Sequence, residues 1–395
     1  MKLPQLPGRE KCCGCGACRA VCPMGAVAMQ PDEEGFLQPA LDEVKCVHCG
    51  KCEAVCPVLH PGKPRTPQAV YAAKAKDDEL RRGSASGGVF TVLAQDVLKR
   101  GGVVFGAGFE RPTWRVIHKA ATNKEELDDL RGSKYVQSDT GDTFKEAKSY
   151  LEAGREVLYS GCPCQIAGLK NFLGTDYPNL LTVDLICHGV PSPLVWRKYL
   201  DCRKSEAGSE ISSVLPRRYC SWRDFSIGLG FRDNSVAGYW NRWDDDLYMR
   251  GYFSYWGFRR CCHECLFRSA DRLSEITIGD YLLIDGVCPG FGNADGVSMA
   301  LGNSARGMSI LLTALKVCDS VAVDYTQAIK DNYPLVRNPR PARLRSEFFR
   351  LLKTQSYDAV ARELLSRRNG SFVMHLLWWV KRFLVNRELN KIKFR

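Results

Sequence analysis

The 395-residue sequence has no apolar run approaching the roughly 18 residues that a membrane-spanning helix requires. It also lacks the apolar segment of a signal peptide, because the first cysteines follow directly after MKLPQLPGREK. These two absences argue against an integral membrane protein and against a secreted one. We therefore expect a cytoplasmic protein.

Acidic residues are fewer than basic ones, 44 against 56, and the formal net charge is +12. Most of this surplus lies at one end, since residues 340–395 hold 14 Lys+Arg and only 4 Asp+Glu. The rest of the chain is close to neutral and lacks the basic face that a nucleic-acid-binding domain presents. We expect no nucleic-acid partner.

Cysteine is abundant, with 19 residues, and in a long chain without a signal peptide this indicates metal or redox chemistry rather than disulfides. The pattern C-x2-C-x2-C-x3-C-P occurs twice near the N-terminus, as in bacterial two-cluster ferredoxins, where the fourth cysteine of each run ligates the other cluster. Paired zinc sites, the alternative, would use separated C-x2-C pairs. Cys13 falls outside the pattern. The predicted ligands of the first 4Fe-4S cluster are Cys12, Cys15, Cys18 and Cys56, and those of the second are Cys46, Cys49, Cys52 and Cys22.

The length indicates two or three domains, and a proline-rich segment at residues 57–70 indicates a linker. After it, helix patterns at 143–152 and 165–172 alternate with strand patterns at 156–160 and 180–187, which is typical of an α/β sheet. The predicted fold is α+β and α/β. The predicted domains are a ferredoxin domain (1–62), a linker (63–69), an α/β domain (70–335) and a helical basic tail (336–395).

A loop of glycine and serine at residues 83–88 precedes an apolar-periodic helix. Free backbone N–H groups at a helix start attract phosphate. The loop contains neither G-x-G-x-x-G nor the GK[ST] of a P-loop, so a helix start that is merely capped by serine remains an equal alternative.

Four further cysteines have spacings or positions suited to ligands: Cys164 and Cys187 follow predicted strands, and Cys262 and Cys265 form a C-x2-C pair. Ligands gather where the strands of such sheets end, so Cys164 and Cys187 are expected to be neighbours in space. Their spacing leaves four interpretations open: a third cluster, a zinc site, buried thiols or a catalytic dithiol.

Taken in order, the stretches GSASGGVFTVL, RGSKYVQSD, YSGCPCQIAGLKNFL, LICHGVPSP, CHECLF, EITIGDY and DGVSMALGNSARG resemble the family of beta subunits of coenzyme F420 (deazaflavin) hydrogenases and dehydrogenases. They span residues 83–307. The resemblance implies a flavin, usually FAD, and an additional iron-sulfur cluster beside it, with Cys164, Cys187, Cys262 and Cys265 as ligands. Position 162 is often threonine in the family, so Cys162 is expected to be a bystander. The implied flavin-site residues are Ser84, Ser86, Gly87, Gly88, Lys134, Tyr135, Gly161, Gly296 and Ser298.

The sequence also departs from the family pattern, with Leu282 in place of an aromatic residue and extra cysteines at positions 220, 261 and 288. Such domains occur in organisms that do not make deazaflavin, so the resemblance supports flavin chemistry better than deazaflavin use. His188 follows a predicted ligand and is a candidate proton relay, with a local hydrogen bond as the alternative.

Clusters move single electrons and a flavin converts them to two-electron chemistry, which predicts an iron-sulfur flavoprotein oxidoreductase. The alternatives are a non-catalytic electron-transfer subunit and a deazaflavin-dependent oxidoreductase. The expected partner is a ferredoxin, a hydrogenase- or dehydrogenase-like subunit, or a small-molecule substrate. Residues 371–395 are apolar, aromatic and basic; they fit either an amphipathic helix on the inner face of a membrane or a helix that packs on protein.

Overall fold

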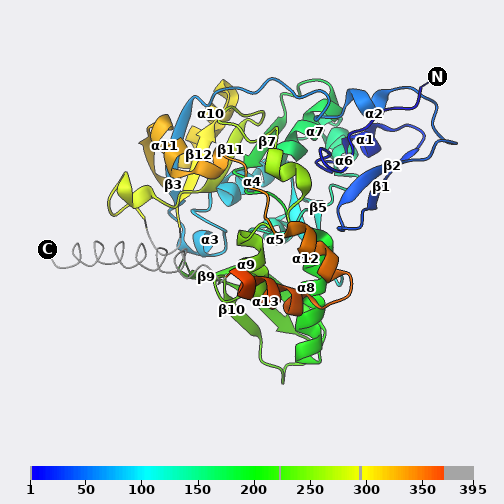
Figure 1. The fold of residues 1–395 in the computed structure, drawn as a ribbon. Helices are drawn as coiled ribbons and strands as arrows, with labels where there is room; N and C mark the ends of the chain where they lie inside the picture. Colours follow the sequence, from blue (N-terminus) through cyan, green and yellow to red (C-terminus); the bar gives the residue numbers. More distant parts are fainter. Residues whose placement is uncertain (1, 222–223, 293–295, 369–395) are drawn as a thin grey trace.

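The computed structural model describes residues 2–221, 224–292 and 296–368, and Figure 1 shows a small N-terminal domain beside a larger body. The expected membrane-contacting segment, residues 371–395, lies outside the described residues. Among the helices that are described, none is long and apolar enough to cross a membrane.

The N-terminal domain consists of two cysteine-rich loops around a two-stranded antiparallel sheet. Each loop leads into a short helix through a glycine in the left-handed conformation, Gly16 (φ 80°) and Gly50 (φ 69°), which other residues adopt only with strain. Its elements are α1 (Ala17–Val21), β1 (Val27–Pro31), β2 (Leu37–Leu41) and α2 (Lys51–Ala54).

The body is built on an eight-stranded mixed sheet with the order β13-β3-β12-β11-β7-β6-β4-β5. The four strands β4, β6, β7 and β11 are mutually parallel and form the centre, and antiparallel strands flank them. This arrangement confirms the predicted α/β class. The strands are β3 (Ala69–Ala75), β4 (Val103–Glu110), β5 (Arg115–Ala121), β6 (Val157–Gly161), β7 (Leu180–Leu185), β11 (Ile276–Asp280), β12 (Ser298–Gly302) and β13 (Cys318–Val323).

Helices cover both faces of this sheet, because its central strands are apolar on both sides. One face packs against α4 (Val89–Lys99), α5 (Lys124–Leu130) and α10 (Ala305–Leu315). The opposite face packs against α6 (Thr143–Glu152) and α7 (Pro163–Leu173). The N-terminal domain adds Cys13, Cys15 and Ala17 to that second core, so the two domains share one hydrophobic cluster.

A second lobe carries the three-stranded sheet β10-β9-β8 and the largest aromatic core. Its strands are β8 (Ile211–Ser221), β9 (Asp224–Phe231) and β10 (Tyr239–Arg242), and its helices are α8 (Pro193–Ala207), α9 (Leu247–Phe253), α12 (Arg345–Leu352) and α13 (Tyr357–Arg368). The short helices α3 (Asp78–Arg82) and α11 (Tyr325–Asp331) lie near the main sheet.

This lobe also contains two helices from the segment that the sequence assigns to a helical basic tail (336–395). Helices α12 and α13 do not form a separate tail, because Phe348, Tyr357, Val360 and Leu364 are almost completely buried in the aromatic core. The composition of the segment is basic, but its basic residues lie between apolar ones at helical spacing. The net charge of the segment therefore gives no indication that its two helices each have an apolar face, which packs in the core.

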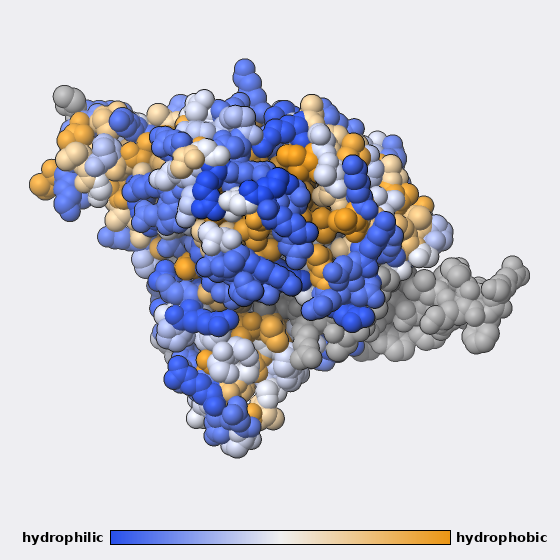
Figure 2. All heavy atoms as spheres, turned by 180° about the vertical axis from the view of Figure 1, so that it is seen from behind, coloured by the Kyte–Doolittle hydropathy of each residue, from blue (hydrophilic) through white to orange (hydrophobic). Residues whose placement is uncertain are grey.

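The expected linker is not free of structure either. Arg65 exchanges both backbone hydrogen bonds with Arg272, at 2.7 and 2.8 Å, and β3 begins at Ala69. Seen from the other side in Figure 2, hydrophobic residues are scattered over the body and reach the outer end of the N-terminal domain. Exposed apolar side chains there include Met24, Val44 and Val47.

Candidate functional site

The eight cysteines of the repeated motif line two separate cavities of the N-terminal domain. One, with an empty volume of about 330 Å³, is lined by Cys22, Cys46, Cys49 and Cys52 together with apolar residues. The other, of about 320 Å³, is lined by Cys12, Cys15, Cys18 and Cys56. This is the grouping that the motif predicts, with the fourth cysteine of each run exchanged.

The thiols of these cavities lie in surroundings suited to a bound anionic group. Backbone N–H groups point at sulfur, from Gly14 to Cys12 at 3.4 Å and from Ala26 to Cys22 at 3.3 Å. Burial raises the pKa of the Cys18 thiol to about 12, and the neighbouring thiols of Cys12 and Cys56 add to this shift. We call the cavity at Cys12 the inner site and the cavity at Cys22 the outer site.

The inner site faces the body of the protein. Gln137 donates to the Cys13 carbonyl (3.0 Å) and Thr140 to the Cys15 carbonyl (2.9 Å). A Cβ atom on Gly168, in α7, would lie 2.8 Å from the Cys15 sulfur, so only glycine permits this approach. The stretch RGSKYVQSDT, which the sequence associated with a flavin, therefore also docks the N-terminal domain.

The later cysteines meet at the ends of β6 and β7, where a 3₁₀ helix, η1 (Arg260–Glu264), also reaches. The closest pair is Cys162 and Cys187, with sulfurs 3.9 Å apart. Their hydrogen bond lowers the pKa of Cys187 to about 6 and raises that of Cys162, and Cys262 and Cys265 lie near enough to act on Cys162 electrostatically. Four thiols are thus brought together: Cys162, Cys187, Cys262 and Cys265, which we call the thiol group.

Cys164 lies on the other side of this motif. The Cys13 sulfur accepts hydrogen bonds from the thiols of Cys15 and Cys164, which lowers the pKa of Cys13 and raises that of Cys164. The sequence expected Cys164 beside Cys187 and Cys162 as a bystander. In the structure Cys162 lies against Cys187, and Cys164 lies between Cys13 of the inner site and the thiols of Cys162 and Cys265, close enough to both to act on them electrostatically. Cys162 precedes the first turn of α7 and Cys164 lies within it, so their side chains leave the turn in different directions.

Gln165 holds this turn in place, a role that the sequence reasoning missed. Its side-chain oxygen accepts from the Cys162 amide at 2.9 Å, and its amide donates to the Ser138 hydroxyl at 3.0 Å. The signal was the G-C-P-C-Q motif itself, in which a glutamine three residues after the start of the turn can cap the helix.

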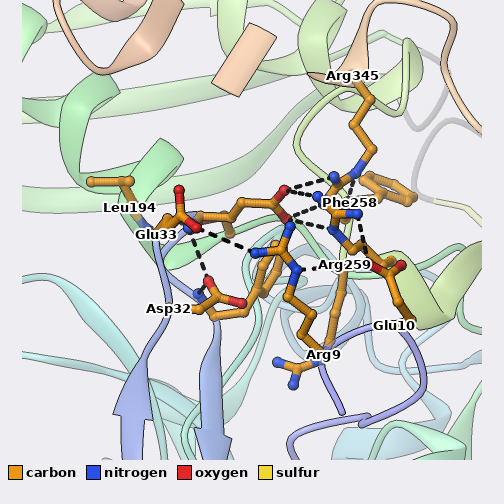
Figure 3. Close-up of polar contacts among 12 residues, drawn as sticks. Arg9, Glu10, Asp32, Glu33, Leu194, Phe258, Arg259 and Arg345 are labelled. Atoms are coloured by element: carbon orange, nitrogen blue, oxygen red, sulfur yellow. Dashed lines mark hydrogen bonds and ion pairs between the residues drawn. The ribbon is translucent and has the colours of Figure 1, made fainter. Parts of the chain in front are cut away.

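A charged network, also missed, fastens the N-terminal domain to the second lobe (Figure 3). Glu34, at the turn between β1 and β2, is buried and accepts from Arg345 (2.9 and 2.5 Å) and Arg260 (2.7 Å). Burial acts to raise the pKa of this carboxyl, but the two guanidinium groups outweigh it and the pKa is lowered. Next to it, exposed Glu33 contacts Lys353 at 2.9 Å.

The glycine-serine loop lies across the start of β12. Ser86 donates to the Val297 carbonyl at 2.9 Å, and a Cβ atom on Gly87 would lie 2.6 Å from the Ser298 amide nitrogen. The structure therefore brings together Ser84, Ser86, Gly87 and Gly88 with Gly296 and Ser298. The Ser84 hydroxyl bonds the Leu80 carbonyl and the Thr91 hydroxyl, whereas α4 begins after Gly88 without a side-chain cap, so the serine does not cap this helix.

Two cations lie beside this loop. Arg131 donates to the Leu80 carbonyl at 2.7 Å, while its Nε is buried and has no hydrogen-bond partner in the described part of the chain. Lys134 donates to the carbonyls of Asp129 and Arg131, and removal from water lowers its pKa to about 7. The Arg131 guanidinium therefore lies at the C-terminal end of α3, and its other terminal nitrogen bonds Asp128 at 2.8 Å.

The other predicted residues are more dispersed. Tyr135 packs on Phe225 and Tyr252 in the aromatic core, with ring centroids 5.9 and 5.0 Å away. His188 is half-buried directly after Cys187. Gly161 ends β6, where a Cβ atom would lie 3.3 Å from Nε2 of buried His118.

The strand register places the thiol group and the glycine-serine loop at the same edge of the sheet. Gly161 of β6 pairs with Asp184 of β7, and beyond β11 the strand β12 pairs Ser298 with Ala73 of β3. This is the carboxyl edge of the parallel strands, where ligands bind in such folds. Strands β6 and β3 are four positions apart, or about 19 Å at about 4.8 Å a strand, a span suited to an extended dinucleotide.

The described residues contain no group of three or more His, Cys, Asp or Glu side chains placed so that they could hold a single metal ion. The 18 cysteines whose side chains the structure describes are free thiols.

Comparison with known families agrees with this domain plan. Residues 70–145 match the N-terminal profile, and residues 154–322 the C-terminal profile, of the coenzyme F420 hydrogenase/dehydrogenase beta subunit. The chain belongs to this family of beta subunits. Residues 11–59 match a 4Fe-4S dicluster domain, so the chain carries an iron-sulfur electron-transfer module in a family of oxidoreductase subunits.

The proteins similar to this chain include two from the genus Methanosarcina. One is a subunit of the F(420)H(2) dehydrogenase of Methanosarcina mazei, which is 26% identical over 175 residues, or 42% of this chain and 49% of that protein. The chain thus matches only about half the length of this curated relative. A chain of the F420-reducing nickel-iron hydrogenase complex from Methanosarcina barkeri aligns with 70% of this chain and 97% of its own length, at 18% identity and a TM-score of 0.45.

Proposed function

We propose that this protein is an iron-sulfur flavoprotein oxidoreductase. In this proposal the dicluster domain supplies single electrons to a third 4Fe-4S cluster and a flavin, and the flavin serves a two-electron acceptor. The proposal rests above all on one observation: the inner site adjoins the thiol group through the hydrogen-bonded pair Cys13 and Cys164, and Gly168 lets Cys15 pack directly on α7. Two domains that exchange electrons need such close contact.

For the third cluster we propose Cys162, Cys187, Cys262 and Cys265 as ligands. This set differs from the one implied by the family resemblance, which used Cys164. It is supported by the mutual proximity of its four members and by the Gly189 amide, which donates to the Cys187 sulfur at 3.4 Å. The guanidinium groups of Arg268 and Arg272 also favour the Cys187 thiolate.

The flavin, most simply FAD, would place its phosphates at the glycine-serine loop, where the N-terminus of α4 and Arg131 supply positive charge. Its ring would lie toward Gly161 and the thiol group along the carboxyl edge. When bound, a flavin accepts electrons singly and passes them on in pairs. His188 stays our candidate for holding a proton near the acceptor.

A second candidate function is that of an electron-transfer subunit whose catalysis resides in another protein, with coenzyme F420 as one acceptor. The subunit character of the matching family favours it. The partner would then be a hydrogenase- or dehydrogenase-like subunit or a ferredoxin, whereas the enzyme hypothesis requires only a small-molecule substrate.

Anaerobic purification followed by iron, sulfide and flavin quantitation tests the proposal. We expect about 12 iron atoms and one flavin per chain; about 8 iron atoms would remove the third cluster. Dithionite or reduced ferredoxin should then reduce the flavin. Turnover of an acceptor by the chain alone supports an enzyme, turnover only after a partner is added supports the electron-transfer role, and the absence of flavin contradicts both.

The two serine variants Cys162→Ser and Cys164→Ser separate the ligand sets. We expect Cys162→Ser to lose about 4 iron atoms, the content of one cluster, and Cys164→Ser to retain its iron. Cys288→Ser, at a cysteine outside the thiol group, is the matched control. The reverse result would restore Cys164 as the ligand.

A further inference from the structure

Arg259 is the largest of the nearly fully buried side chains, only 1% exposed, and the part of the chain that the structure describes offers it no carboxylate within ion-pair distance. Its guanidinium donates to the Cys12 carbonyl (2.7 Å), the Leu37 carbonyl (2.9 Å) and the Gln137 side-chain oxygen (3.0 Å). All three acceptors are neutral. A buried cation is costly to hold unless an anion lies nearby.

The neighbouring carboxylate does not supply that anion. Glu34 is already shared by Arg260 and Arg345, so this interface holds more buried positive charge than negative charge. The groups that favour the charged form of Arg259 and raise its pKa against the effect of burial are the thiols of Cys12, Cys261, Cys13 and Cys262.

The position of Arg259 is equally specific. One end of the guanidinium reaches Cys12 of the inner site, and a Cβ atom on Gly14 would lie 2.7 Å from its Nη1. Its backbone carbonyl accepts from the amide of Cys262, in the thiol group, at 3.0 Å. The side chain also stacks over Phe36, 5.3 Å from the ring centroid, which keeps water away from it.

We propose that Arg259 is a positioning residue that supplies the counter-charge for electrons resident at the inner site and the thiol group. The inference rests on the proposed function, because the anion it requires is an iron-sulfur cluster with its four thiolates. A fixed positive charge favours the reduced state of a neighbouring cluster, since reduction adds one negative charge. The guanidinium thus makes the inner site easier to reduce than it would be without this charge.

The test is an electron paramagnetic resonance redox titration of the full chain, purified anaerobically, for wild type, Arg259→Gln and Arg259→Lys. Arg259→Gln keeps a hydrogen-bond donor but removes the charge. We expect its inner cluster to require a more negative potential, with at least a tenfold change in the reduced-to-oxidised ratio, about 59 mV for one electron. The outer cluster, at Cys22, Cys46, Cys49 and Cys52, should be unshifted, and Arg259→Lys should stay close to wild type.

Arg203→Gln is the control for general damage, because Arg203 is also buried but lies in the second lobe with Asp358 as its partner. Equal potentials in wild type and Arg259→Gln would overturn the proposal. If Arg259→Gln retains no inner cluster, Arg259→Lys decides: retention supports a need for charge, and loss in both variants means that shape, not charge, is required. Wild-type protein without iron would instead refute the proposed function before any variant is made.

Discussion

Removing the negative charge of Glu34 should loosen the N-terminal domain from the body. The perturbation is Glu34→Gln, which leaves the buried guanidinium of Arg345 without its ionised partner. Breaking a buried pair by removing one partner costs about 3–5 kcal/mol. We expect the lower end, about 3 kcal/mol, because Arg260 is partly exposed and keeps its contact with Glu10.

This cost corresponds to a drop of about 100-fold in the ratio of docked to undocked protein, at 1.36 kcal/mol for each factor of ten. The lowered pKa of Glu34 also sets a pH dependence. Its stabilising contribution is present at neutral pH and is lost as the pH falls through the range in which the carboxyl protonates.

The assay is urea denaturation of the cluster-loaded chain under anaerobic conditions, followed by the absorbance of the clusters. Glu33→Gln is the matched control, since the same substitution at the neighbouring, exposed carboxylate should change little. Indistinguishable denaturation midpoints for the two variants would refute the reasoning, because burial is the only large difference between the two sites.

Two further predictions concern α7 and β5. A Cβ atom at position 168 would lie 2.8 Å from the Cys15 sulfur, so Gly168→Ala should lower the free energy of unfolding by about 1–3 kcal/mol and reduce the iron content of the inner site. Gly286→Ala is the control, because a Cβ atom there would meet nothing within 4 Å. A normal iron content in Gly168→Ala would contradict the packing argument. Burial lowers the pKa of His118 to about 4 from 6.5, so the unfolded chain gains a proton before the native one as the pH falls. Wild type should therefore lose about 2 kcal/mol more stability than His118→Phe between pH 7 and pH 5, and parallel losses would count against a neutral His118.

Local patterns predicted the elements that depend on short-range constraints. The helix expected at residues 143–152 is α6 with the same bounds, and the expected strand at 156–160 is β6 shifted by one residue. The motif also predicted which cysteines of the dicluster domain group together, because ligands held two or three residues apart leave the backbone few arrangements.

The arrangement of the later cysteines could be predicted only in outline. Strand ends predicted that Cys164 and Cys187 lie at one edge of the sheet, but the direction in which Cys162 and Cys164 point depends on how Gln165 and Ser138 orient the first turn of α7. The packing of α12 and α13 in the aromatic core could not be predicted from the basic composition of residues 336–395, since net charge does not reveal which face of a helix is apolar.

The sequence by itself determined the chemistry of this protein: thiolates at ligand spacing, an α/β frame and a loop suited to phosphate. Only the tertiary structure decided how these parts are joined. Glu34 and Arg345 come from two distant segments, and neither belongs to a motif. Their pairing follows from burial, because a charge removed from water must find its partner in space, wherever the chain brings one.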